Sequence, residues 1–66
     1  MTYTADQLRS ALYQEHVFFH HEEDSLMHPD DYMQQLASMS SFELIAETDV
    51  DDNDDLDFYM SCWLPS

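Results

Sequence analysis

The sequence predicts an α+β fold: two short helices packed on a C-terminal antiparallel β-hairpin, in a single small domain, residues 1–66. Three observations predict it. Apolar residues recur at helical spacing near the N-terminus, a proline opens a second such segment, and apolar residues alternate with others near the C-terminus. Folding of so short a chain hides only about 60% of its surface, so the core is thin. Still, 44% of the residues are hydrophobic, too many for a typical disordered segment.

The first element is a helix that runs from residue 4 to about residue 19. Thr4 and Gln7 have the spacing of a capping box, in which each side chain satisfies a free backbone N–H group of the first turn. The stripe expected to face the core repeats at helical spacing and comprises Ala5, Leu8, Leu12 and Phe19. Val17 and Phe18 either widen this stripe or mark a change to extended chain, and we favour the helix.

A polar break over residues 20–27, which holds the cluster HHEEDS, separates this helix from a second one. Pro29 suits the first position of a helix, where its missing N–H has no consequence. His28 is then the cap, and Met27 and Tyr32 can pack as a hydrophobic staple. The second helix should end near the three serines around position 40.

The last third of the chain predicts the β-hairpin. Its final strand alternates with period two and would bury one face, namely Leu56, Phe58, Met60, Cys62 and Leu64. Residues 42–47 alternate less cleanly and predict the partner strand. The segment SSFELIAE is alternatively helical, although Ser41 and Leu44 do not complete a capping box. TDVDDNDD lies between the two runs and predicts the hairpin loop, with Asn53 best suited to a left-handed conformation.

The charge is the strongest functional signal. The chain has 15 Asp and Glu residues, a single cation, Arg9, and a formal net charge of −14. Fourteen charges correspond to about 24 Å of duplex DNA, and a compact domain of this length is about 28 Å across. A basic DNA-binding groove should therefore attract this protein through the same long-range field. The lack of a basic patch argues against direct binding of nucleic acid or of an anionic membrane.

Most of the acids fall in two zones of the sequence, which we predict to be partner-binding. The first zone comprises Glu22, Glu23, Asp24, Asp30 and Asp31, and the second comprises Glu43, Glu47, Asp49, Asp51, Asp52, Asp54, Asp55 and Asp57. The alternative is an ordinary solvated face and loop, but such a face has no need to exclude Lys and Arg from the whole chain. The sequence leaves open whether the two zones form one surface.

A calcium loop is incomplete in this sequence. An EF-hand that starts at Asp49 needs glycine at its sixth position and a bidentate glutamate at its twelfth, where the chain has Asp54 and Met60. We therefore expect at most weak, unspecific binding of divalent cations by the carboxylates.

A zinc site is also weakly supported. His16 and His20 share a helix face, and a third ligand is available from Glu23, Asp24 or His28. The HExxH signature is absent because a serine follows His21-Glu22 at the required histidine position. We predict no metal and no cofactor, and expect the neighbouring carboxylates to favour protonated histidines.

Catalysis and export have little support. Cys62 lies in the predicted core strand and reads as a small buried hydrophobe, and a single cysteine fits a reducing compartment. The opening residues MTYTADQLRS lack the basic start and apolar stretch of a signal peptide, and no apolar run approaches the ~20 residues of a membrane span. We expect a non-enzymatic protein of the cytoplasm.

The length, the absence of Lys and Gly, the opening MTYTADQLRS and the stretch ETDVDDNDDLD resemble the small acidic phage proteins that disarm bacterial defence, in particular anti-CRISPR proteins of the DNA-mimic kind. For type I systems, the resemblance implies binding to the DNA-recruiting surface of the surveillance complex, often on its large subunit, so that target DNA cannot load. It also implies that the cytoplasm in question is that of the bacterial host. Similar acidic mimics act on restriction enzymes, uracil-DNA glycosylase or nucleoid proteins.

The sequence therefore predicts an inhibitor that mimics DNA charge, with Tyr59 and Trp63 as exposed aromatic anchors. The rival interpretation is an acidic interaction module, such as an antitoxin or a modulator of RNA polymerase or a sigma factor. Such a module would also bind a basic protein, but apolar contacts would dominate its interface.

Overall fold

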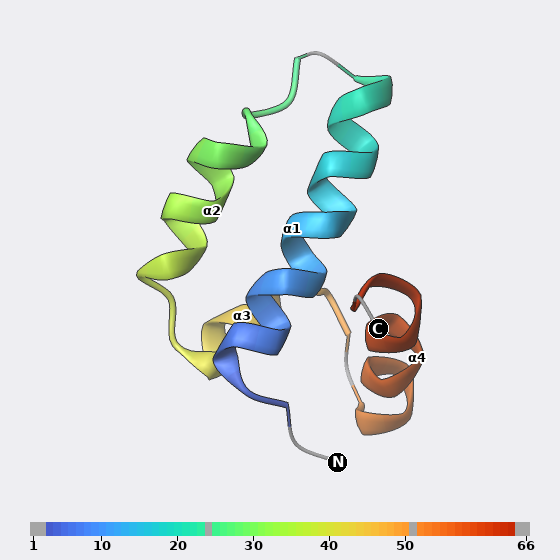
Figure 1. The fold of residues 1–66 in the computed structure, drawn as a ribbon. Helices are drawn as coiled ribbons and strands as arrows, with labels where there is room; N and C mark the ends of the chain where they lie inside the picture. Colours follow the sequence, from blue (N-terminus) through green and yellow to red (C-terminus); the bar gives the residue numbers. More distant parts are fainter. Residues whose placement is uncertain (1–2, 24, 51, 65–66) are drawn as a thin grey trace.

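The computed structural model describes residues 3–23, 25–50 and 52–64, which form four helices and, within these ranges, no strand (Figure 1). The longest helix, α1 (Ala5–Glu22), packs against each of the other three, α2 (Pro29–Ala37), α3 (Ser41–Glu47) and α4 (Asn53–Trp63). α2 returns antiparallel to α1, and α4 runs in the same direction as α1 on its other side (Figure 1). The predicted α+β fold with a C-terminal β-hairpin is therefore wrong.

The capping box at the start of α1 is confirmed. The backbone N–H of Gln7 donates to the Thr4 hydroxyl at 3.1 Å, and the backbone N–H of Thr4 donates to the Gln7 side chain at 2.9 Å. The helix continues to Glu22, so the polar break begins later than expected. His20 and His21 lie in the last turn, where the helix dipole favours basic groups.

The start of α2 also follows the prediction. The Nδ1 atom of His28 accepts a hydrogen bond from the backbone N–H of Asp30 at 3.1 Å, and Pro29 takes the first helical position. Asp30 and Asp31 occupy the first turn, where negative charge is favourable. The helix ends at Ala37, just before the serines.

The segment predicted as the first strand is the short helix α3. Its cap is Ser40, whose hydroxyl accepts from the backbone N–H of Glu43 while the Glu43 carboxylate accepts from the backbone N–H of Ser40. The capping box thus begins one residue before Ser41, the position considered in the sequence. This reciprocal pair favours helix over the irregular alternation of residues 42–47.

The segment predicted as the second strand is α4. Leu56 and Met60, four residues apart, are 5% and 1% exposed, whereas Phe58 is 72% exposed and Cys62 is also exposed. A strand would have buried all four on one face, but a helix places only residues three and four apart together. Half-buried Tyr59 and Trp63 complete the inward stripe.

The predicted hairpin loop is divided between a turn and a helix start. Asp49 has a positive φ of 61°, and it is Asp49, not Asn53, that takes the left-handed conformation. The carboxylate of Asp52 caps α4 by accepting from the backbone N–H of Asp55 at 2.8 Å. Asn53 is the first residue of that helix.

The core is small and lies where the other helices meet α1. Its buried apolar residues are Leu8, Ala11, Leu12, Leu36, Leu44, Leu56 and Met60. The radius of gyration is 11.5 Å, and the molecule extends 33 × 23 × 22 Å along its principal axes. No helix in the described ranges is both long enough and apolar enough to cross a membrane.

Candidate partner-binding surface

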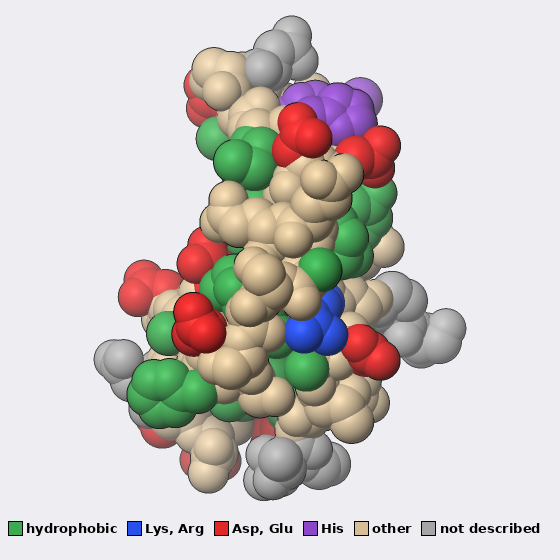
Figure 2. All heavy atoms as spheres, turned by 90° about the vertical axis from the view of Figure 1, so that its left-hand side faces the viewer, with side chains coloured by type: hydrophobic (Ala, Val, Ile, Leu, Met, Phe, Trp, Pro, Cys, Tyr) green, Lys and Arg blue, Asp and Glu red, His purple; other side chains and the backbone are tan. Residues whose placement is uncertain are grey.

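The two acidic zones lie at opposite ends of the molecule. The first surrounds the connection between α1 and α2, and the second follows α3 and the start of α4 (Figure 1). The 18 residues of α1 span about 27 Å. Viewed from the α2 side, acidic side chains appear near the top of the face and again from its middle downward (Figure 2). The zones do not separate completely, because the Glu47 carboxylate of the second zone accepts a hydrogen bond from Tyr32, the residue that follows Asp31 of the first.

Of the thirteen predicted partner-binding residues, eleven lie in the described ranges, and Asp24 and Asp51 lie outside them. Ten of the eleven are exposed, namely Glu22, Glu23, Asp30, Asp31, Glu43, Glu47, Asp49, Asp52, Asp54 and Asp55. The eleventh, Asp57, is half-buried and accepts a hydrogen bond from the Tyr3 hydroxyl at 2.6 Å. Asp57 thus ties α4 to the segment before α1.

Several exposed acids also have a local structural role. Asp52 and Glu43 take part in helix caps, and Asp54 and Asp55 lie in the first turn of α4. These positions satisfy backbone N–H groups or the helix dipole. Folding therefore accounts for part of the acidity near α3 and α4, whereas no such contact involves Glu22.

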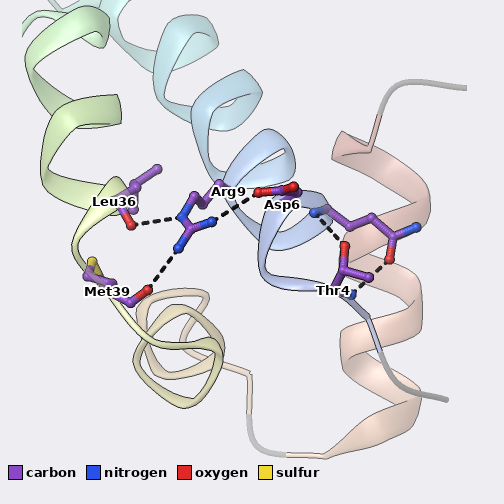
Figure 3. Close-up of polar contacts among 6 residues, drawn as sticks. Thr4, Asp6, Arg9, Leu36 and Met39 are labelled. Carbon is purple, nitrogen blue, oxygen red and sulfur yellow. Dashed lines mark hydrogen bonds and ion pairs between the residues drawn. The ribbon is translucent and has the colours of Figure 1, made fainter.

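The side chain of Arg9, the single Lys or Arg residue, bonds to other residues of the same chain (Figure 3). The Nε atom of Arg9 donates to the Leu36 carbonyl at 3.0 Å, and Nη2 donates to the Met39 carbonyl at 3.1 Å. Nη1 forms an ion pair with Asp6 at 3.0 Å. Arg9 is the only Lys or Arg residue of the chain, and its side chain is only 23% exposed, so the described surface presents its carboxylates with one partly covered guanidinium among them.

A cluster of two carboxylates and two tyrosines joins all four helices. The Tyr59 hydroxyl of α4 donates to Glu15 of α1 at 3.1 Å, and the Tyr32 hydroxyl of α2 donates to Glu47 of α3 at 3.3 Å. The His16 ring stacks on Tyr32 with centroids 4.2 Å apart.

This environment shifts the pKa values of its members. Burial raises the pKa of Glu15, and the nearby Glu47 charge adds to that rise, against the hydrogen bond from Tyr59 and the proximity of His16. Burial, helped by the Glu47 charge, raises the pKa of Tyr32 to about 12. Burial and then the Glu15 charge raise the pKa of Tyr59.

Sequence reasoning missed Glu15, although a signal was present. Glu15 lies three residues after Leu12 and four before Phe19, and so on the predicted apolar stripe of α1. A carboxylate on such a stripe indicates a half-buried acid with a polar partner.

Three histidines meet where α1 and α2 come together. The rings of His16 and His20 are 6.4 Å apart, and those of His20 and His28 are 5.7 Å apart. His16 Nε2 contacts the Met27 carbonyl, and His28 Nδ1 accepts the cap hydrogen bond of α2. No group of three His, Cys, Asp or Glu in the described ranges is placed to hold a metal ion. Asp24, a candidate third ligand, lies outside those ranges.

The exposed aromatic residues are not the ones predicted. Tyr59 is half-buried and bonded to Glu15, and Trp63 is half-buried against Phe18. The most exposed large apolar side chains are Phe42, at 82%, and Phe58, at 72%. The sequence predicts Phe58 on a buried strand face and Phe42 in the partner strand, and both are exposed in the helices that form instead.

Comparisons with known proteins found no relative: no family model matches, no curated protein matches the sequence, and no solved structure matches the fold.

Proposed function

We propose that this protein is an acidic decoy that mimics the charge of DNA and occupies a basic DNA-binding surface on another protein. One observation supports the proposal most directly. Ten predicted partner-binding carboxylates are exposed, while the only guanidinium group of the chain is bonded internally by Asp6 and two backbone carbonyls. An ordinary soluble domain mixes both signs on its surface.

The charge density supports DNA as the object of mimicry. Fourteen net charges over the 33 Å long axis amount to one charge per roughly 2.4 Å, against one per about 1.7 Å of duplex DNA. A protein groove that attracts DNA therefore experiences a field of similar strength from this molecule.

The resemblance to anti-CRISPR proteins makes the DNA-recruiting surface of a type I surveillance complex the first target to test. Inhibition at such a surface would be competitive with target DNA and would weaken as salt screens the charges.

The test is a mobility-shift competition between the full chain and labelled target DNA for the purified surveillance complex, at low and high salt. We expect loss of the DNA complex that added DNA or salt reverses. Inhibition that persists unchanged at high salt would contradict charge mimicry. If this complex does not respond, a restriction enzyme and a uracil-DNA glycosylase are the next targets for the same assay.

Neutralised variants identify the zone that binds. One variant replaces Glu22 and Glu23 by glutamine, and a second replaces Asp54 and Asp55 by asparagine. The matched control, Asp54→Glu with Asp55→Glu, keeps the charge at nearly the same place. We expect the variant at the binding zone to inhibit at least tenfold more weakly and the control to inhibit as the native chain does.

The rival interaction module is favoured by one specific observation, the exposure of Phe42 and Phe58 on α3 and α4. Aromatic residues are frequent energetic centres of protein interfaces. Replacing both by serine should abolish binding to a partner held by apolar contacts and should leave a charge-driven decoy nearly intact. In the competition assay, this double variant distinguishes the two functions.

A further inference from the structure

A groove of about 640 Å³ lies between α1 and α4, outside both acidic zones. Gln14 and Phe18 line it from α1, and Ser61, Cys62 and Trp63 line it from the last turn of α4. Its volume is in the range of pockets that accept a small molecule or a long side chain. None of the side chains that line it is charged.

One wall of the groove is aromatic. The ring centroids of Phe18 and Trp63 are 5.7 Å apart, and Phe19 lies 6.3 Å from Trp63 and 5.4 Å from Phe18. About half of the Phe18 and Phe19 surfaces is exposed. Aromatic rings with accessible faces attract cations through their quadrupoles, most strongly in the case of tryptophan.

The other end of the groove is the C-terminus of α4. A helix of 11 residues presents a partial negative charge there, and the last turn of α4 contains no basic residue to neutralise it. The last carbonyl groups of an α-helix have no partner within the helix, so those of the last turn of α4 can accept from an external donor.

The charge around the groove also favours a cationic occupant. Glu22 is exposed and follows Phe18 by four residues, on the same face of α1. The net charge of −14 adds a long-range attraction for any cation. The occupant with complementary charge is a cationic side chain of a basic partner.

We infer that this groove receives an arginine side chain of the basic protein that the decoy binds, an inference that rests on the proposed function. The guanidinium plane stacks on the Trp63 ring, and its N–H edge meets the Phe18 ring, which is inclined by 62° to that of Trp63. Its N–H groups also donate to the carbonyls of the last turn of α4 and to the Gln14 amide oxygen. Lysine fits less well, because its ammonium is a strongly hydrated point charge that neither stacks nor offers a planar fork of donors.

Trp63 is the only tryptophan of the chain, so its fluorescence reports on the groove directly. The probe is a short peptide of alternating glycine and arginine, compared with the same peptide carrying lysine or the neutral isostere citrulline. We expect a saturable change in Trp63 emission with the arginine peptide, weaker binding of the lysine peptide and no binding of the citrulline peptide. The arginine peptide should also slow alkylation of Cys62, the single exposed thiol.

The variant is Phe18→Leu, which keeps an apolar side chain but removes the ring. Phe42→Leu is the matched control, because Phe42 is exposed and does not line this groove. We expect Phe18→Leu to bind the arginine peptide roughly tenfold more weakly and Phe42→Leu to bind it unchanged. Equal emission changes with arginine and lysine peptides, or equal binding by Phe18→Leu, would overturn the inference.

The DNA-competition assay separates this inference from the proposed function. If Phe18→Leu inhibits as well as the native chain while the variants with neutralised acids inhibit more weakly, the arginine groove is refuted and the charge decoy stands. If neither change affects inhibition, the charge decoy itself is refuted.

Discussion

Replacing Met60 by alanine tests whether the C-terminal segment is a helix or a strand. Met60 is 1% exposed and packs in the core, whereas Phe58, two residues earlier, is 72% exposed. Truncation of a buried methionine to alanine costs about 2–5 kcal/mol, while a substitution at an exposed site usually changes stability by less than about 0.5 kcal/mol. A strand would place both side chains on the same face, so the two variants would then cost similar amounts.

The expected loss of stability is large relative to the total free energy of unfolding. At about 0.05–0.15 kcal/mol per residue, a 66-residue chain has a free energy of unfolding of roughly 3–10 kcal/mol. With a urea dependence of about 1 kcal/mol per molar, a loss of about 3 kcal/mol lowers the unfolding midpoint by about 3 M. We expect this shift for Met60→Ala and almost none for Phe58→Ala.

The assay is urea denaturation followed by circular dichroism at 222 nm and by Trp63 emission. Met60→Leu is the control, because it conserves most of the volume and should cost less than about 1.5 kcal/mol. If Phe58→Ala destabilises the protein as much as Met60→Ala does, the helical assignment of α4 is refuted.

Three further predictions concern polar groups. Arg9→Met should cost about 1–3 kcal/mol, because it removes the donor of the Met39 carbonyl and leaves the Leu36 carbonyl only the backbone N–H of Met39. Arg9→Lys should recover part of the loss, and a thermal melt that is equal for all three proteins would contradict the role of Arg9. Asp52→Ala should cost about 1 kcal/mol and reduce helicity, whereas Asp52→Ser, which can still cap α4, should not. For Glu15, burial raises the pKa above its ordinary value of 4.5, so the folded chain holds this proton more tightly than the unfolded chain. The resulting stability is present below pH 4.5 and is lost as the pH rises through the raised pKa. Glu15→Gln should therefore raise the melting temperature at pH 7, and its advantage should shrink as the pH falls toward 4.5. A constant difference across this range would show that Glu15 is not the titrating group.

The N-terminal half of the fold could be predicted because its signals are local. The side chains of Thr4 and Gln7 bond each other's backbone, and His28 with Pro29 begins α2 in the same way. Such caps depend on residues within a few positions of each other, so the sequence contains all the information that is needed.

The C-terminal half could not be assigned from its period alone. Leu56, Met60 and Leu64 are spaced by four residues, which fits both a strand face and a helix face. The alternation seemed complete only because Phe58 and Cys62, both apolar, are exposed. The acidic residues at the start of α4 could have identified this segment as a helix, but the sequence prediction places them in a hairpin loop.

The sequence predicts which acidic residues are exposed, but not how they are arranged on the surface. Exposure of carboxylates follows from their hydration, and ten of the eleven described partner-binding candidates are exposed as that rule implies. Their division between two ends of the molecule depends on how α1 separates its neighbours, which no local pattern contains. The internal use of Arg9 depends in the same way on the approach of α2.

The internal bonding of Arg9 also governs how copies of this protein behave toward one another. With its only guanidinium occupied, each molecule presents one sign of charge to every other copy. Phe42 and Phe58 would ordinarily promote self-association, but at 0.1 M salt the repulsion still extends over about 10 Å. We therefore expect this repulsion to keep copies of the chain apart at low salt despite the exposed aromatic rings, and concentrated salt to make the protein precipitate or dimerise.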